Sequence, residues 1–170
     1  MPVTLFLPGI EATLALGRLL AQALPVDAPY QTVLLDGGMG AGKTTLTRGF
    51  VEALPGGGDA EVSSPSFNLC NVYPTRPEVV HCDLYRLEGM PPDDDLLETL
   101  EAGDRLVIVE WAQYLSAPFR PSCHLLLRWL PGESGRTVAI TATGETARRY
   151  RDELYPRLSS VGRGNDIRIM

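Results

Sequence analysis

The sequence predicts a single α/β domain in three layers, with a mixed central β-sheet between helices. Strand-like and helix-like stretches alternate from the first residues of the chain onward. Two short apolar runs, residues 32–35 and 106–109, have the composition of strands buried on both faces. Two further strand-like stretches, residues 67–73 and 78–83, are separated by a turn short enough for antiparallel pairing. The sheet is therefore expected to contain both parallel and antiparallel strands.

The remaining elements follow from apolar spacing and from residues that end helices. A first strand over residues 3–7 precedes a helix over residues 10–24, in which leucines recur at helical spacing. The next helix, residues 43–54, ends where a proline and three glycines follow. A short helix over residues 94–102 begins with acidic residues, which favour a helix N-terminus. The C-terminal part is expected to add two strands and a last helix, at residues 122–130, 136–143 and 145–158.

Size and composition are those of one globular domain. The chain has 170 residues, of which 44% are hydrophobic and 21% charged, and its formal net charge is −6. A chain of this length can bury a core without disulfides or metals. Residues 1–158 are expected to form the domain, and residues 159–170 a loosely ordered tail with little apolar pattern. The negative charge argues against a protein that holds nucleic acid by itself, because that affinity comes from cations on phosphates.

The cysteines and the N-terminus predict a cytoplasmic protein. Cys70, Cys82 and Cys123 are odd in number and lack metal-ligand spacing, so reduced thiols are expected. No run approaches the ~18 apolar residues of a membrane span, and the N-terminus lacks the features of a signal peptide. No membrane partner is expected.

A complete phosphate-binding motif joins a predicted strand to a predicted helix. Residues 37–44 read GGMGAGKT and match GxxxxGK[ST] in full. Glycines let the backbone curl around phosphates with its N–H groups inward, and the following helix adds its positive end. Lys43, the only lysine among 15 cationic residues, is expected to bridge the terminal phosphates, and Thr44 to offer its hydroxyl to Mg²⁺. Nucleotide contacts are expected from Gly37, Gly38, Met39, Gly40, Ala41, Gly42, Lys43, Thr44 and Thr45.

Two carboxylates at strand ends are candidates for catalysis together with Lys43. Asp83 ends the stretch 78–83, and Glu110 follows the stretch 106–109. A magnesium nucleotide needs a carboxylate near the metal, and two acids in one role would repel each other. Asp83 is therefore expected to bind magnesium, directly or through water, and Glu110 to polarise the attacking water. The alternative is that either acid simply ends its strand in solvent.

Two other features have weaker implications. Residues 63–67, SSPSF, form either a turn or a loop that brings a hydroxyl to the γ-phosphate, and the residues alone favour the turn. His81 and His124 are given no catalytic role, because a lone histidine on an apolar strand is usually a packed residue.

The order of these segments resembles the TsaE family, the P-loop ATPases of bacterial threonylcarbamoyladenosine synthesis on tRNA. The resemblance rests on GGMGAGKTT (37–45), SPSF (64–67), HCDLYRL (81–87) and VEWA (109–112), in the family's order and at its spacing. It implies a P-loop NTPase-like fold, ATP and Mg²⁺ as cofactors, and a metal site at Thr44, Ser66, Asp83 and Glu110. Two departures are Ser66, where threonine is usual, and Gly38, where an acid is common.

The resemblance also implies a role and partners. It describes a slow ATPase that supports N6-threonylcarbamoylation of adenosine 37 in ANN-decoding tRNAs through the TsaD and TsaB proteins. The tRNA would be met only through that complex.

Three other functions are alternatives. A small-molecule P-loop kinase usually carries an arginine-bearing lid, and residues 120–136 contain no evident lid helix. A GTP switch would carry an NKxD motif for guanine, which this sequence lacks. A nucleotide-binding scaffold without turnover would keep the phosphate motif and give Glu110 no role.

Overall fold

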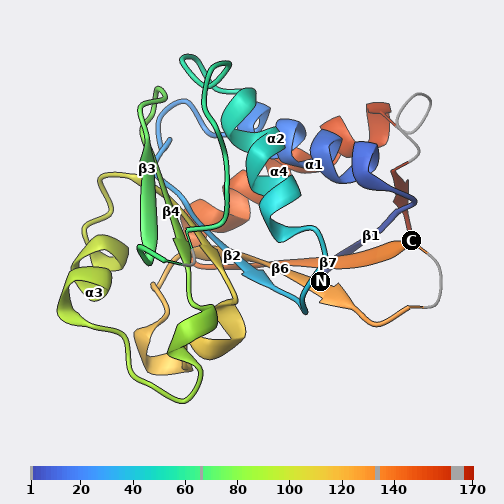
Figure 1. Cartoon of the computed structure of the whole chain (residues 1–170). Helices are drawn as coiled ribbons and strands as arrows, with labels where there is room; N and C mark the ends of the chain where they lie inside the picture. The colour runs from blue at the N-terminus through green and yellow to red at the C-terminus, as the bar shows by residue number, and fades with distance from the viewer. Residues whose placement is uncertain (1, 66, 133–134, 162–166) are drawn as a thin grey trace.

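The computed structural model describes residues 2–65, 67–132, 135–161 and 167–170, and these residues form three layers (Figure 1). The strands are β1 (Val3–Leu7), β2 (Thr32–Asp36), β3 (Cys70–Tyr73), β4 (Val79–Asp83), β5 (Leu106–Glu110), β6 (His124–Leu130), β7 (Arg136–Thr143) and β8 (Arg168–Ile169). The helices are α1 (Ile10–Gln22), α2 (Lys43–Glu52), α3 (Asp94–Glu101) and α4 (Glu145–Val161), with short 3-10 turns at Tyr85–Leu87, Ala112–Tyr114 and Ala117–Phe119. Helices α1, α2 and α4 cover one face of the sheet and α3 lies on the other.

The sheet is mixed, as predicted. Its strand order is β3-β4-β5-β2-β6-β7-β1-β8. Strands β4, β5, β2 and β6 run parallel to one another, whereas β3, β7, β1 and β8 pair antiparallel with their neighbours. Because parallel strands end at the same edge, the phosphate motif after β2 and the acids at the ends of β4 and β5 come together.

Alternation along β4 and β5 directs particular side chains toward α2. Leu106 and Ile108 belong to the core beneath α1, α2 and α4, whereas Val107 and Val109 belong to the core beneath α3. Successive residues of a strand point to opposite faces, so Glu110 lies on the α2 side. Asp83 pairs in register with Glu110 and, by the same alternation on β4, faces that side as well.

Two glycines let α1 and α2 approach each other closely. A methyl group added to Gly17 would lie 2.2 Å from the carbonyl oxygen of Leu46, and one added to Gly49 would lie 2.2 Å from that of Leu14. No side chain larger than hydrogen fits at either position without moving a helix. The start of α2, which follows the phosphate motif, is thereby held close against α1.

The described part of residues 159–170 lies at the end of a helix and at the edge of the sheet. Helix α4 continues to Val161, and β8 pairs with Leu5 and Phe6 of β1 at the edge of the sheet. Ile167, just before β8, is 2% exposed and packs in the core beneath α1, α2 and α4. One buried apolar side chain therefore anchors the end of the chain, a signal too short to register as a periodic pattern.

The expectation of reduced thiols is wrong for two of the three cysteines. Cys70 and Cys82 form a disulfide between β3 and β4, and Cys123 is free. The two residues are directly opposed in the antiparallel pair, with their Cα atoms 4.0 Å apart. The register of the β3–β4 pair places the two cysteines opposite each other, and their separation of 12 residues in the sequence does not reveal this contact.

In the parts of the chain that the structure describes, no helix combines the length and apolar character needed to cross a membrane.

Candidate functional site

The phosphate motif forms the loop between β2 and α2, in the strand–loop–helix setting that the sequence predicts. Gly40 and Gly42 have φ angles of 71° and 108°, in the left-handed region that favours glycine. Gly42 is also the N-cap residue of α2, directly before Lys43. The loop therefore turns sharply, and the N-terminus of α2 points toward the cavity beside the loop.

A cavity of about 550 Å³ opens at this loop. It brings together motif residues and both candidate acids, namely Met39, Gly40, Ala41, Gly42, Lys43, Thr44, Thr45, Asp83 and Glu110. Gly37 and Gly38 are not part of its lining, and their contribution is a pair of carbonyl oxygens that contact Lys43. Most of the predicted motif residues and both predicted acids therefore line one cavity.

Lys43 is 5% exposed and folded back onto its own loop. Its Nζ donates hydrogen bonds of 2.7 Å to the carbonyl oxygens of Gly37 and Gly38 and lies 3.9 Å from the centre of the Trp111 ring. Burial lowers the pKa of Lys43, and the negative charges of Glu110 and other nearby acids oppose that shift. The ammonium group is thus a desolvated cation at the wall of the cavity.

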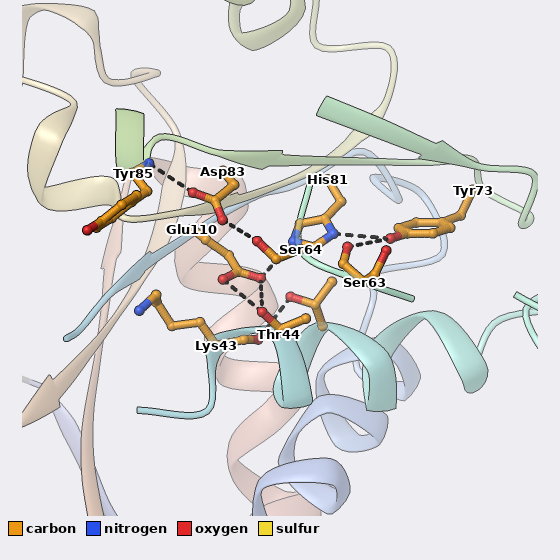
Figure 2. Close-up of polar contacts among 10 residues, drawn as sticks. Lys43, Thr44, Ser63, Ser64, Tyr73, His81, Asp83, Tyr85 and Glu110 are labelled. Atoms are coloured by element: carbon orange, nitrogen blue, oxygen red, sulfur yellow. Dashed lines mark hydrogen bonds and ion pairs between the residues drawn. The ribbon is translucent and has the colours of Figure 1, made fainter. Parts of the chain in front are cut away.

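Thr44 and Glu110 are in direct contact, as Figure 2 shows. The Thr44 hydroxyl lies 2.9 Å from Oε1 and 3.1 Å from Oε2 of Glu110 and donates to that carboxylate. Glu110 is 2% exposed, whereas Thr44 is half-buried, and both line the cavity. The hydroxyl that the motif assigns to magnesium is therefore next to a carboxylate from the neighbouring strand.

Asp83 faces the same cavity with a different set of partners. Its carboxylate accepts hydrogen bonds from the Ser64 hydroxyl and, over 2.8 Å, from the backbone N–H of Tyr85. Ser64 belongs to the SSPSF segment, which is more than a surface turn because one of its hydroxyls reaches a candidate acid. Ser66, the expected metal-contacting serine, lies outside the described residues.

A buried histidine that the sequence left without a role joins this cluster. His81 is fully buried, and its Nε2 lies 2.8 Å from Oε1 of Glu110. Its Nδ1 lies 3.3 Å from the hydroxyl of Tyr73, which also lies 3.3 Å from the carbonyl oxygen of Ser63 (Figure 2). A usable signal was present in the sequence, because His81 and Asp83 are two residues apart and therefore share one face of a strand.

Several other side chains also line the cavity. Two are cationic, and the others are hydrophobic or aromatic: Arg86, Arg136, Ile10, Phe67, Tyr85 and Trp111. Arg136 comes from β7, and its Nε lies 3.5 Å from the position that a methyl group on Gly42 would occupy. Sequence spacing does not show that β7 reaches the phosphate motif, since almost 100 residues separate them.

Comparisons with known proteins agree with this geometry. The family model described as "Threonylcarbamoyl adenosine biosynthesis protein TsaE" matches residues 7–138. A Streptomyces coelicolor protein named tRNA threonylcarbamoyladenosine biosynthesis protein TsaE is 41% identical over 102 residues, covering 58% of this chain and 66% of that protein. A Nostoc protein of the same name is 35% identical over 146 residues, covering 81% of this chain and 84% of its own length.

A solved structure agrees as well. The crystal structure of Bacillus subtilis YdiB superimposes with a TM-score of 0.70 at 26% identity, covering 92% of this chain and 97% of that one. The three-layer arrangement is therefore a P-loop NTPase-like fold. With the family model spanning most of the chain and the Nostoc relative matching over most of both lengths, this protein belongs to the TsaE family of tRNA threonylcarbamoyladenosine biosynthesis.

Proposed function

We propose that this protein binds ATP with Mg²⁺ and hydrolyses it slowly. In this proposal, ATP turnover supports N6-threonylcarbamoylation of adenosine 37 in ANN-decoding tRNAs through TsaD and TsaB. The single observation that carries the proposal is the contact of Thr44 with Glu110 beside the buried Lys43, all in one cavity. A motif lysine, a motif hydroxyl and a strand-end carboxylate are the groups that P-loop NTPases place around a magnesium nucleotide.

Lys43 is the residue proposed to hold the terminal phosphates. Its present partners are neutral carbonyl oxygens of Gly37 and Gly38. A phosphate oxygen is a stronger acceptor for the ammonium group because its negative charge attracts the positive charge of Lys43 directly. Nucleotide binding would thus exchange two loop contacts for phosphate contacts and compensate the buried ammonium charge.

The donor atoms around Thr44 fit a magnesium ion. The Thr44 hydroxyl and the Glu110 carboxylate beside it are hard oxygen donors, the class that Mg²⁺ prefers. Among the described residues, no three His, Cys, Asp or Glu side chains form a metal cage, which agrees with a site completed by nucleotide phosphates and water. When bound, Mg²⁺ would neutralise charge on the phosphates.

The contacts lead us to assign the two acids differently from the sequence expectation. Glu110 is the acid that touches Thr44, so we assign Glu110 to the magnesium shell and to orienting water there. Asp83 is bonded to Ser64, so we assign Asp83 to holding residues 63–65 at the γ-phosphate side of the cavity. Each acid then has its own neighbours, which reduces the repulsion of two carboxylates in one role.

We propose slow turnover because the two arginines that line the cavity, Arg86 and Arg136, already lie against other groups. The Arg86 guanidinium lies 5.0 Å from the centre of the Phe67 ring, and the Arg136 side chain lies beside Gly42. An arginine placed on the transferring phosphoryl group is typically worth about 10³ to 10⁵ in rate. We therefore assign TsaD and TsaB the role of completing the site, either by supplying a cation or by fixing Arg86 in place.

The proposal is tested by following the γ-phosphate of labelled ATP. The purified protein is incubated with ATP and Mg²⁺, alone and with TsaD and TsaB, and phosphate release is compared with transfer to small-molecule acceptors. Phosphate that appears in water, and faster with the partners, is the expected result. Transfer to an acceptor would instead indicate a kinase, and binding without any release would indicate a scaffold.

A further inference from the structure

A buried hydrogen-bonded chain leads from β3 into the candidate site. Tyr73 on β3 contacts His81 on β4, and His81 contacts Glu110 on β5. A carboxylate can only accept hydrogen bonds, so the Nε2 atom of His81 carries the proton in its contact with Glu110. We infer that His81 is a positioning residue, which fixes the Glu110 carboxylate against Thr44 for ATP hydrolysis. This inference rests on the proposed function.

Glu110 depends on His81 because few groups restrain its carboxylate. Among the residues that the structure describes, hydrogen bonds to the Glu110 side chain come from Thr44 on α2 and His81 on β4. Two donors from different elements define both the position and the rotation of the carboxylate. With Thr44 alone, the carboxylate could pivot about one hydroxyl, and a loosely held side chain is a poor scaffold for water or metal.

A purely structural role accounts less well for this arrangement. A buried histidine needs hydrogen-bond partners, and a backbone carbonyl would be sufficient. His124 illustrates that case, because it is 7% exposed and its Nδ1 contacts the carbonyl oxygen of Pro121 at 2.8 Å. His81 instead directs its proton to a carboxylate that lines the cavity. The two histidines thus form a matched pair, one inside the site and one outside it.

Tyr73 lies between His81 and the segment that contacts Asp83. With the His81 proton on Nε2, the one hydroxyl proton of Tyr73 can go to Nδ1 of His81 or to the carbonyl oxygen of Ser63, which both lie 3.3 Å away, and the next residue, Ser64, bonds to Asp83. The chain from Tyr73 therefore connects the neighbourhoods of Glu110 and Asp83. Because Tyr73 touches Nδ1 rather than the Glu110 contact itself, its removal is expected to have a smaller effect than removal of His81.

The test compares the wild type with two variants at position 81 and one variant at position 73. His81→Gln retains an N–H donor near the position of Nε2, His81→Leu removes it at similar volume, and Tyr73→Phe removes only the outer hydroxyl. We expect His81→Leu to lower kcat for phosphate release about ten- to hundredfold with little change in the KM for ATP, as misplacement of an active-site group does. His81→Gln should keep kcat within about threefold of wild type, and Tyr73→Phe should fall between the two.

His124→Leu provides the control for loss of a buried histidine. It should lower the melting temperature without changing kcat. The inference is overturned if His81→Leu keeps the wild-type kcat, if His81→Gln is as slow as His81→Leu, or if His124→Leu lowers kcat equally.

A second readout separates this inference from the proposed function. If the wild-type protein releases no phosphate even with TsaD and TsaB, hydrolysis is refuted, and the affinity for ATP is then measured with and without Mg²⁺. His81→Leu should reduce the gain in affinity that Mg²⁺ gives, whereas His81→Gln should preserve it. An equal gain in wild type and His81→Leu would overturn the positioning role independently of turnover.

Discussion

Replacing either glycine between α1 and α2 should destabilise the protein, although alanine is the better helix former. Alanine in place of glycine inside a helix is normally favourable by about 1 kcal/mol. At Gly17, however, the added methyl group would lie 2.2 Å from the Leu46 carbonyl oxygen and 2.8 Å from the Phe50 nitrogen. At Gly49 it would lie 2.2 Å from the Leu14 carbonyl oxygen. All three obstacles are backbone atoms, so no change of side-chain rotamer relieves the contact.

The size of the effect follows from the separation that the helices must gain. An ordinary contact needs 3.4 Å or more, so the helices must move apart by roughly 1 Å, and overpacking of this kind costs about 1–3 kcal/mol. Taking the upper part of that range and subtracting the propensity gain leaves a net loss of about 2 kcal/mol for Gly17→Ala. For a chain of this length, that loss corresponds to a fall in melting temperature of roughly 4–8 °C.

Thermal unfolding followed by circular dichroism measures the effect, with Gly58→Ala as the control. A methyl group at Gly58 meets nothing within 4 Å, so this variant should unfold like the wild type. Because α2 starts with Lys43 and Thr44, Gly17→Ala should also weaken ATP binding at temperatures where the protein is still folded. A melting temperature for Gly17→Ala equal to or above that of the wild type would refute the close packing of α1 on α2.

Three further predictions concern single side chains. Lys43→Ala should lower ATP affinity at least tenfold while leaving the melting temperature nearly unchanged, because a charge-assisted phosphate contact is worth about 1.5–3 kcal/mol. Titration by calorimetry measures the ATP affinity, and an unchanged affinity would exclude the phosphate role of Lys43. Glu110→Gln should lower kcat and weaken the Mg²⁺ dependence of ATP binding. Asp83→Asn should also lower kcat but have less effect on the Mg²⁺ dependence of ATP binding. Equal Mg²⁺ dependence in both variants would contradict the assignment of Glu110 to the metal. Burial lowers the pKa of His124 below 6.5, so the unfolded chain binds a proton that the folded protein does not, and the free energy of unfolding should fall by up to about 1.4 kcal/mol per pH unit below pH 6.5. Urea unfolding of wild type and His124→Gln at about pH 7.5 and 5.5 measures this contribution, and identical losses in both proteins would contradict it.

Local signals in the sequence identified the elements that position the phosphate motif. Strand β7 has the bounds predicted for it, and the helix after the motif begins at Lys43 as predicted. Buried strands β4 and β5 were recognisable because apolar runs end in an acid, which is a pattern within a few residues. These features depend on neighbours in the sequence, so the chain alone was sufficient to predict them.

Features that depend on register or on distant strands could not be predicted in this way. The disulfide depends on Cys70 and Cys82 being opposite each other in an antiparallel pair, and the approach of Arg136 depends on where β7 lies in the sheet. The role inferred for His81 depends on β4 lying directly beside β5, so that Nε2 reaches Glu110. The register of a strand pair and the pairing of strands that are distant in the sequence are properties of the whole fold, and no local pattern contains them.

The central claim is that ATP bound at Lys43 and Thr44 is hydrolysed to support repeated cycles of tRNA modification. The most direct measurement is multiple-turnover N6-threonylcarbamoylation of an ANN-decoding tRNA by TsaD and TsaB, with phosphate release followed in the same reaction. Adding the wild-type protein should sustain modification beyond the first turnover, while Glu110→Gln should bind ATP and fail to sustain it. Modification that cycles equally well without the protein, or with Glu110→Gln in its place, would contradict the claim.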